Sequence, residues 1–180
     1  NNSRKHTDML CTFSAVVLKS QTLSWFHVGD TRIYHFHQGK LDCLTQDHAY
    51  KERSQTYLAR ALGGSTRIDV DYSELMLEEH DLILLTSDGV HESLSHKQIS
   101  EHLQHYEGNP EHCCQSLVEL ALTNGSQDNL TAVLLKVESL AGPSLEESHE
   151  QLTALPIPPA LEVGQKIDHF QVNKVIFSGT

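Results

Sequence analysis

Three acidic turns in this sequence could together hold a divalent cation. They are Gly29-Asp30-Thr31-Arg32, Ser87-Asp88-Gly89 and Gln127-Asp128-Asn129. Each places a carboxylate directly after an apolar strand or an ordered loop, where it can be held rigidly, and carboxylates at several strand ends can converge on one hard cation. A single Asp-Gly or Asp-Asn is weak support, because these are common turn dipeptides whose side chains bind their own backbone. Only the combination of the three turns indicates a cation site.

Short apolar runs broken by turn residues predict the strands that would position these carboxylates. We expect strands at Phe13–Leu18, Leu23–Val28, Ile33–Phe36, Leu41–Leu44, Ile68–Tyr72, Leu82–Thr86 and Leu130–Val137. The short link Gln38-Gly39-Lys40 favours an antiparallel hairpin between the third and fourth runs. Apolar and acidic residues alternate from Ile68 to Tyr72, which is the period of a half-buried strand.

Two helices are expected between the last two strands. Ser95 can cap a helix that runs to about Tyr106, with Ile99 and Leu103 on one face. Pro110 opens a second helix, which Asn124-Gly125 ends. The apolar stripe of this second helix, at helical spacing, comprises Cys113, Leu117, Leu120 and Ala121.

The overall composition narrows the class of protein. Of the 180 residues, 38% are hydrophobic and 21% are charged, which is typical of a globular chain with one core and a tail. The net charge of -11 repels the phosphates of nucleic acids and anionic lipid surfaces, so we expect no nucleic-acid partner. No run approaches the length of about 18 apolar residues that a membrane helix needs, and we expect no membrane segment in this chain.

The cysteines and histidines carry no metal motif of their own. The four cysteines form no CxxC pair, and adjacent Cys113 and Cys114 are poorly placed to form a disulfide with each other. This cysteine usage indicates a reduced, cytoplasmic protein. The thirteen histidines are scattered singly, and we interpret the closest group, His35 and His37, as strand surface rather than zinc ligands.

Five segments of the sequence carry motifs in a fixed order. They are Trp25 to Tyr34 with its Gly-Asp-Thr-Arg, Thr45-Gln46-Asp47-His48, Arg60-Ala61-Leu62-Gly63, Leu84 to Val90 with its Ser-Asp-Gly, and Ser126 to Thr131 with its Asp-Asn-x-Thr. In type and order they resemble the motifs of the metal-dependent protein serine/threonine phosphatases of type 2C. Thr31 stands where that family has Ser, and Leu10-Cys11-Thr12 stands near its Gly-Thr-Thr strand entry. Both departures are tolerable for packing.

The resemblance implies an α+β fold, a β-sandwich of two antiparallel sheets flanked by helices with metals at one end. It implies that Asp88 and Asp128 are catalytic and ligate the second metal of a binuclear magnesium or manganese centre, while Asp30 serves a third, looser metal site. Supporting residues would be Gly89, Asn129 and Arg32, the last paired with the Asp30 carboxylate or a backbone carbonyl. Two cations roughly 3.5 to 4 Å apart can activate a water for in-line attack on a phosphoprotein substrate, without a protein nucleophile.

The same resemblance divides the chain into three parts. Residues 1–139 would be the carboxyl-terminal part of the phosphatase domain, whose missing amino-terminal part completes the first metal site. We expect this part alone to be unfolded or inactive, because strand edges would stay unpaired. Residues 140–163 hold four of the five prolines with clustered Glu and Ser and should be a linker. Residues 164–180 form an expected strand and resemble the start of a protein kinase domain, as in bacterial bifunctional phosphatase/kinase proteins.

Other functions are compatible with parts of this pattern. The leading hypothesis is metal-dependent hydrolysis of phosphoserine and phosphothreonine. The alternative is a catalytically inactive phosphatase-like module that controls the attached kinase, and the three intact aspartates argue against it. A plain β-rich binding domain with acidic turns would explain each motif but not the order that the motifs share.

Overall fold

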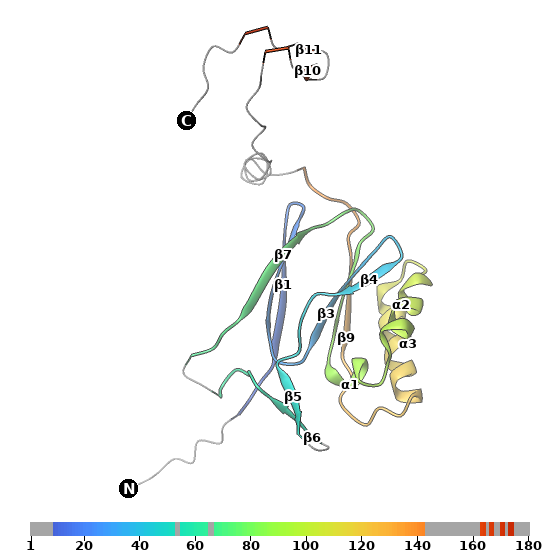
Figure 1. Cartoon of the computed structure of the whole chain (residues 1–180). Helices are drawn as coiled ribbons and strands as arrows, with labels where there is room; N and C mark the ends of the chain where they lie inside the picture. Colours follow the sequence, from blue (N-terminus) through green and yellow to red (C-terminus); the bar gives the residue numbers. More distant parts are fainter. Residues whose placement is uncertain are drawn as a thin grey trace. The chain divides into compact units, whose positions relative to one another are not determined.

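The computed structural model describes residues 9–52, 55–64 and 67–142, together with 163–164, 166–167, 170–171 and 173–174. The chain divides into two units, Asn1–Gly142 and Pro143–Thr180 (Figure 1). The first unit contains strands β1 to β9 and helices α1 to α3, and the described part of the second contains β10 and β11.

A three-stranded antiparallel sheet forms one layer of the first unit. Its strands, in spatial order, are β1 (Phe13–Lys19), β2 (Thr22–Val28) and β7 (Asp71–Met76). Along β2, Leu23, Trp25 and His27 are buried and alternate with less buried residues, because successive side chains of a strand point to opposite faces. The first two expected strands are therefore confirmed.

The expected strand at Ile68–Tyr72 is only partly correct, since β7 begins at Asp71. Val70 and Tyr72 are 44% and 56% exposed, so the apolar alternation in this run does not mark a buried face. Pairing with β2 begins where Asp71 lies opposite the buried His27.

A four-stranded antiparallel sheet forms the second layer. Its strands, in spatial order, are β4 (Lys40–Cys43), β3 (Arg32–His37), β8 (Leu82–Thr86) and β9 (Ala132–Lys136). The predicted hairpin between β3 and β4 is confirmed: Gln38 and Gly39 have φ of 46° and 80°, the left-handed pair that a tight hairpin turn requires. In the central pair Arg32 lies opposite Thr86 and Phe36 opposite Leu82, so each end of β3 meets an opposite end of β8.

A small hairpin follows β4 in sequence and was not predicted. It pairs β5 (Ala49–Glu52) with β6 (Gln55–Leu58). The stacked rings of Tyr50 and Tyr57 lie 5.7 Å apart across it. The sequence of these strands is mostly polar, so it lacks the apolar period that revealed the others.

Three helices cover the four-stranded sheet: α1 (Asp88–His91), α2 (His96–Gln104) and α3 (Pro110–Thr123). The predicted cap of α2 is confirmed, because the Ser95 hydroxyl accepts the Gln98 N–H while the Gln98 side chain accepts the Ser95 N–H. Asn109 caps α3, and Gly125 follows its end with φ of 92°. The short helix α1 was not predicted.

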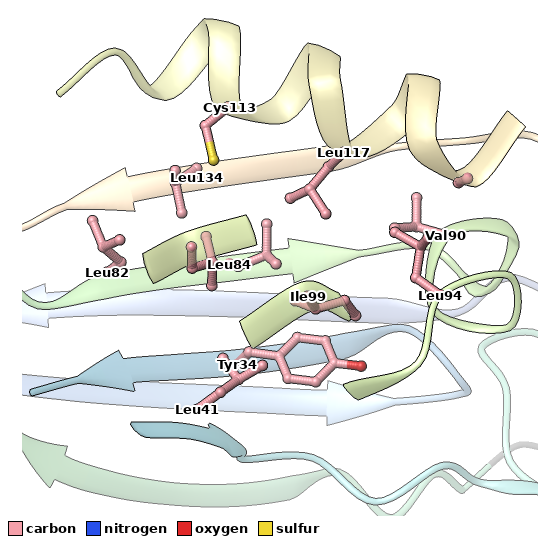
Figure 2. Packing of buried hydrophobic residues seen from close by; sticks show 12 residues of the cluster. Tyr34, Leu41, Leu82, Leu84, Val90, Leu94, Ile99, Cys113, Leu117 and Leu134 are labelled. Carbon is pink, nitrogen blue, oxygen red and sulfur yellow. The ribbon is translucent and has the colours of Figure 1, made fainter. Parts of the chain in front are cut away.

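Two apolar cores hold these three layers together. One lies between the sheets and is built by Leu23, Trp25, Ile33, Leu77, Ile83 and Val137. The other lies between the four-stranded sheet and the helices, and Figure 2 shows Cys113 and Leu117 of α3 directed toward Leu134 of β9. Each fully buried leucine or isoleucine contributes roughly 1.5 to 3 kcal/mol. The described residues thus confirm the α+β fold with an antiparallel sandwich flanked by helices.

The second unit is described only in short pieces. Strands β10 (Lys166–Ile167) and β11 (Phe170–Gln171) pair antiparallel, where a single strand was expected. Most of the predicted linker at 140–163 lies outside the described residues. Among the residues that the structure describes, no helix is both long and apolar enough to cross a membrane.

Candidate metal centre

One end of the β3–β8 pair opens onto an acidic pocket. Because these strands are antiparallel, the turn before β3 and the turn after β8 meet at this end. The pocket has a volume of about 400 Å³ and is lined by Asp30, Arg32, Asp47, Ala49, Asp88, His91 and Glu92. The structure therefore brings together Asp30 and Asp88, two of the three predicted ligands, which are far apart in sequence.

The carboxylates of this pocket repel one another. Asp30 is partly buried, and its pKa is raised, first by burial and next by the charge of Asp88. Asp88 Oδ1 accepts the Gly89 N–H at 2.9 Å. The Asp30 and Asp88 carboxylates supply the negatively charged oxygen ligands that a hard divalent cation prefers, and they lie in one pocket. The residues present fit magnesium or manganese.

Asp128, the third predicted ligand, lies beside the Asp88 turn rather than in the pocket lining. Its side chain is exposed, and its Oδ1 accepts the Asn129 N–H at 2.7 Å. A Cβ added to Gly89 would stand 3.2 Å from Asp128 Cβ and 2.6 Å from the Asn129 carbonyl oxygen. Only glycine allows the two turns to approach this closely.

Ser87 ties the same two turns together. Its N–H donates to the Thr131 carbonyl at 3.0 Å, and its Oγ both donates to the Asn129 carbonyl and accepts the Thr131 N–H, each at 3.0 Å. Asn129 thus takes part in this link through its backbone carbonyl. The positions of Asp88 and Asp128 depend on each other through these bonds.

Arg32 pairs with Asp47, so the expected pairing with Asp30 or a backbone carbonyl was wrong. Arg32 Nε lies 2.9 Å from Asp47 Oδ1, and Arg32 Nη2 lies 2.7 Å from Oδ2. This two-point contact fits the planar guanidinium to a carboxylate and lowers the pKa of Asp47. Arg32 therefore neutralises Asp47. The motif Thr45 to His48 was the sequence signal for Asp47, although no site role was assigned to it.

His48 connects two of the recognised motifs to the Asp30 turn. Its Nδ1 accepts the Gly29 N–H at 3.2 Å, so its Nε2 carries the proton and donates to Asp71 Oδ2 at 2.9 Å. Arg60 Nη1 contacts the other oxygen of the same carboxylate at 2.8 Å. The Arg-Ala-Leu-Gly loop and the Thr-x-Asp-His segment therefore brace the backbone that carries Asp30.

The Thr31 hydroxyl belongs to a second polar network under the pocket. Thr31 Oγ1 lies 2.6 Å from Ser14 Oγ, which in turn lies 2.9 Å from His27 Nδ1. His27 Nε2 lies 3.2 Å from the Gln46 carbonyl and donates to it, so the Ser14 hydroxyl donates to Nδ1. Threonine supplies the same hydroxyl as the serine of the family motif, and this departure is accommodated.

His91 lines the pocket and was missed by the sequence reasoning. It is 6% exposed, and its Nδ1 lies 2.9 Å from Thr86 Oγ1. Burial, followed by the nearby Arg32 cation, lowers its pKa to about 4. His91 is therefore neutral near pH 7 and adds no charge to the pocket. Its only sequence signal is its place one turn after the Ser-Asp-Gly motif.

An antiparallel sandwich with acidic turns gathered at one end matches the class that the motifs resemble. Residues 1–134 match the protein phosphatase 2C family, and the chain belongs to that family. The serine/threonine protein phosphatase PstP of Mycobacterium tuberculosis is 31% identical over 146 residues, which cover 70% of this chain and 27% of that protein.

Solved structures show the same likeness. A serine/threonine phosphatase of S. agalactiae superposes with a TM-score of 0.70 at 27% identity, over 76% of this chain and 63% of that one. The catalytic domain of PstP, solved in complex with two manganese ions, gives a TM-score of 0.62 at 28% identity, over 71% of this chain and 59% of that one. The chain thus spans between 27% and 63% of the length of these proteins.

Proposed function

We propose that this chain belongs to a protein serine/threonine phosphatase that hydrolyses phosphoserine and phosphothreonine with a metal-activated water. The observation that carries the proposal is the convergence of Asp30 and Asp88 in one pocket, with Asp128 beside it. Membership in the protein phosphatase 2C family supports it. The activity is proposed for the full-length protein, and we expect the 180-residue chain alone to lack it.

Magnesium or manganese is the proposed cofactor, as a binuclear centre with a possible third ion. Asp88 and Asp128 would hold the second ion of the pair, and Asp30 would hold the third. When bound, such ions activate water and offset the negative charge of the phosphoryl oxygens. The chain's own residues orient the ligands: the backbone N–H groups of Gly89 and Asn129 each fix one oxygen of the neighbouring carboxylate. Arg32 holds Asp47, so this carboxylate does not compete for the cation.

The partners follow from the same proposal. The substrate would be a phosphoprotein, and a kinase domain beginning at residue 164 would make the full-length protein a bifunctional signalling enzyme. Only the sequence of residues 164–180 supports the kinase. The location proposed from cysteine usage, four cysteines with no CxxC pair, is a reducing cytoplasm.

The test is hydrolysis of para-nitrophenyl phosphate and of a phosphothreonine peptide by the full-length protein, with and without manganese. We expect activity that requires the metal and falls at least a hundredfold in Asp88→Asn and in Asp128→Asn. Asp42→Asn is a matched control, because Asp42 is exposed on β4. Unchanged rates in the first two variants would refute the assignment.

The alternative proposal is a catalytically inactive module that regulates an attached kinase. A well-folded, metal-supplied protein with no phosphatase activity would support this alternative. The uncompensated carboxylates of the pocket favour the enzyme, since a module that binds no metal has no need to keep Asp30 and Asp88 together.

A further inference from the structure

The far end of the β3–β8 pair gathers a second set of potential metal ligands. His35 and His37 share one face of β3, since they are two residues apart on a strand. Asp81 directly precedes β8, next to the Phe36–Leu82 pair, and so faces the end of β3. The ligand atoms of these three residues all lie within 4.8 Å of one another.

The three side chains already converge on a single point. His35 Nε2 lies 2.8 Å from Asp81 Oδ2, and His37 Nδ1 lies 2.6 Å from Asp81 Oδ1. The Asp81 side chain is 2% exposed, His35 13% and His37 31%. One flank of the cluster is therefore buried, while His37 reaches solvent and leaves a route for an ion to enter.

Surrounding groups fix the orientation of these ligands. The Glu78 N–H donates to Asp81 Oδ2 at 2.9 Å, and Glu78 Oε1 lies 3.9 Å from His37 Nε2, the ring nitrogen that faces away from Asp81. The Asp81 carbonyl accepts the N–H of Val137, the residue that follows β9, at 2.9 Å. A carboxylate behind a histidine is the usual outer partner of a metal-bound imidazole.

We propose that His35, His37 and Asp81 form a transition-metal site, with Zn²⁺ as the preferred ion. The ligands would be His35 Nε2, His37 Nδ1 and one Asp81 oxygen, which leaves one position of a tetrahedron open. Zinc bonds of about 2.0 to 2.2 Å need ligand atoms roughly 3.4 Å apart. The contacts of 2.8 and 2.6 Å to Asp81 would lengthen, and ligand atoms that lie up to 4.8 Å apart would approach each other by up to about 1.4 Å. Imidazole ligands favour zinc over magnesium, unlike the carboxylates Asp30 and Asp88 of the pocket at the other end.

The test is a titration of the full-length protein with Zn²⁺ in excess Mg²⁺, which competes for the carboxylates of the acidic pocket. We expect one zinc equivalent to bind with a rise in melting temperature, and Co²⁺ to give the visible absorption of a tetrahedral complex. Zinc affinity should fall at least a hundredfold in His35→Gln and in His37→Gln. It should fall about tenfold in Glu78→Gln, which removes only the outer partner.

Two control variants separate this site from the rest of the molecule. His112→Gln removes an exposed histidine of α3, and Asp88→Asn disables the acidic pocket, and both should bind zinc with unchanged affinity. If the wild-type protein binds no zinc, or if His37→Gln and Glu78→Gln bind it as tightly as wild type, the proposal is overturned. In that case, the two histidines serve only as hydrogen-bond partners of the Asp81 carboxylate.

Discussion

The two ends of the β3–β8 pair hold carboxylates under opposite conditions. At the Asp30 end, burial together with the charge of Asp88 raises the pKa of Asp30. At the Asp81 end, burial alone would raise the pKa, but hydrogen bonds from the Glu78 N–H and from the histidines outweigh it and lower the pKa. The strand between them spans about 17 Å at roughly 3.4 Å per residue. Asp81 accepts several hydrogen bonds and supports the fold. Asp30 and Asp88 repel each other, and a bound cation can relieve this repulsion.

The largest effect is expected from removing the satisfied carboxylate. Asp81→Ala leaves His35, His37 and the Glu78 N–H without their acceptor, and each buried donor left unsatisfied costs about 1 to 3 kcal/mol. Urea denaturation with a chelator present measures the free energy of unfolding. Asp42→Ala, which removes an exposed carboxylate of β4, should change it by less than about 0.5 kcal/mol. Equal effects in the two variants would show that burial does not distinguish Asp81.

A pH-dependent effect is expected at the Asp30 end, from His91. Its pKa is about 4 in the fold against 6.5 for an exposed histidine. The folded state thus favours the neutral ring. The contribution of His91 to the free energy of unfolding is full above pH 6.5, falls as the pH drops from 6.5 to about 4 because the unfolded state binds the proton more readily, and is constant below that. The gap corresponds to on the order of 3 kcal/mol.

The His91 effect is measured by urea denaturation between pH 7 and pH 4. His91→Gln should lose less stability over this window than wild type does, because it carries no ring to protonate. His112→Gln, at an exposed position, should keep the wild-type slope. Parallel slopes for wild type and His91→Gln would contradict the burial of a neutral ring beside Arg32.

The smallest effect is expected from relieving the repulsion in the pocket. Without metal, Asp30→Asn should raise the free energy of unfolding by about 0.5 kcal/mol, since partly exposed charges interact weakly. With manganese present, wild type should be more stable than Asp30→Asn, because an ion that binds only the folded state stabilises most the protein that binds it more tightly. Melting curves with and without manganese measure both. An Asp30→Asn variant that is less stable without metal would show that Asp30 supports the fold as Asp81 does.

Local patterns in the sequence predicted most of the elements. The strand Leu82–Thr86 was placed at its observed bounds, and the Gln38-Gly39 turn and the Ser95 cap were recognised from short-range chemistry. These features depend on a few neighbouring residues, so they can be read from a single chain. The β5–β6 hairpin lacks such a pattern, and the apolar alternation near β7 was misleading because Tyr72 is exposed.

Contacts between distant segments could not be predicted in the same way. The three acidic turns at strand ends indicated one cation site, but the role of each of Asp30 and Asp88 was expected only because the motifs resemble a known family. Arg32 was assigned the wrong partner, since its pairing with Asp47 depends on the loop that follows β4. His35 and His37 were interpreted as strand surface because nothing local reveals that the antiparallel register of β3 and β8 sets Asp81 against them.

Ser87 has a consequence for how the acidic end opens. Its backbone and hydroxyl link the turn after β8 to the turn before β9 through three hydrogen bonds, so neither turn can separate without breaking all three. Local opening should therefore be cooperative, and the amide protons of Ser87 and Thr131 should exchange with solvent at a common rate. The turns that carry Asp88 and Asp128 would then open together and close together. Native molecules in which only one of the two carboxylates is in position would be rare.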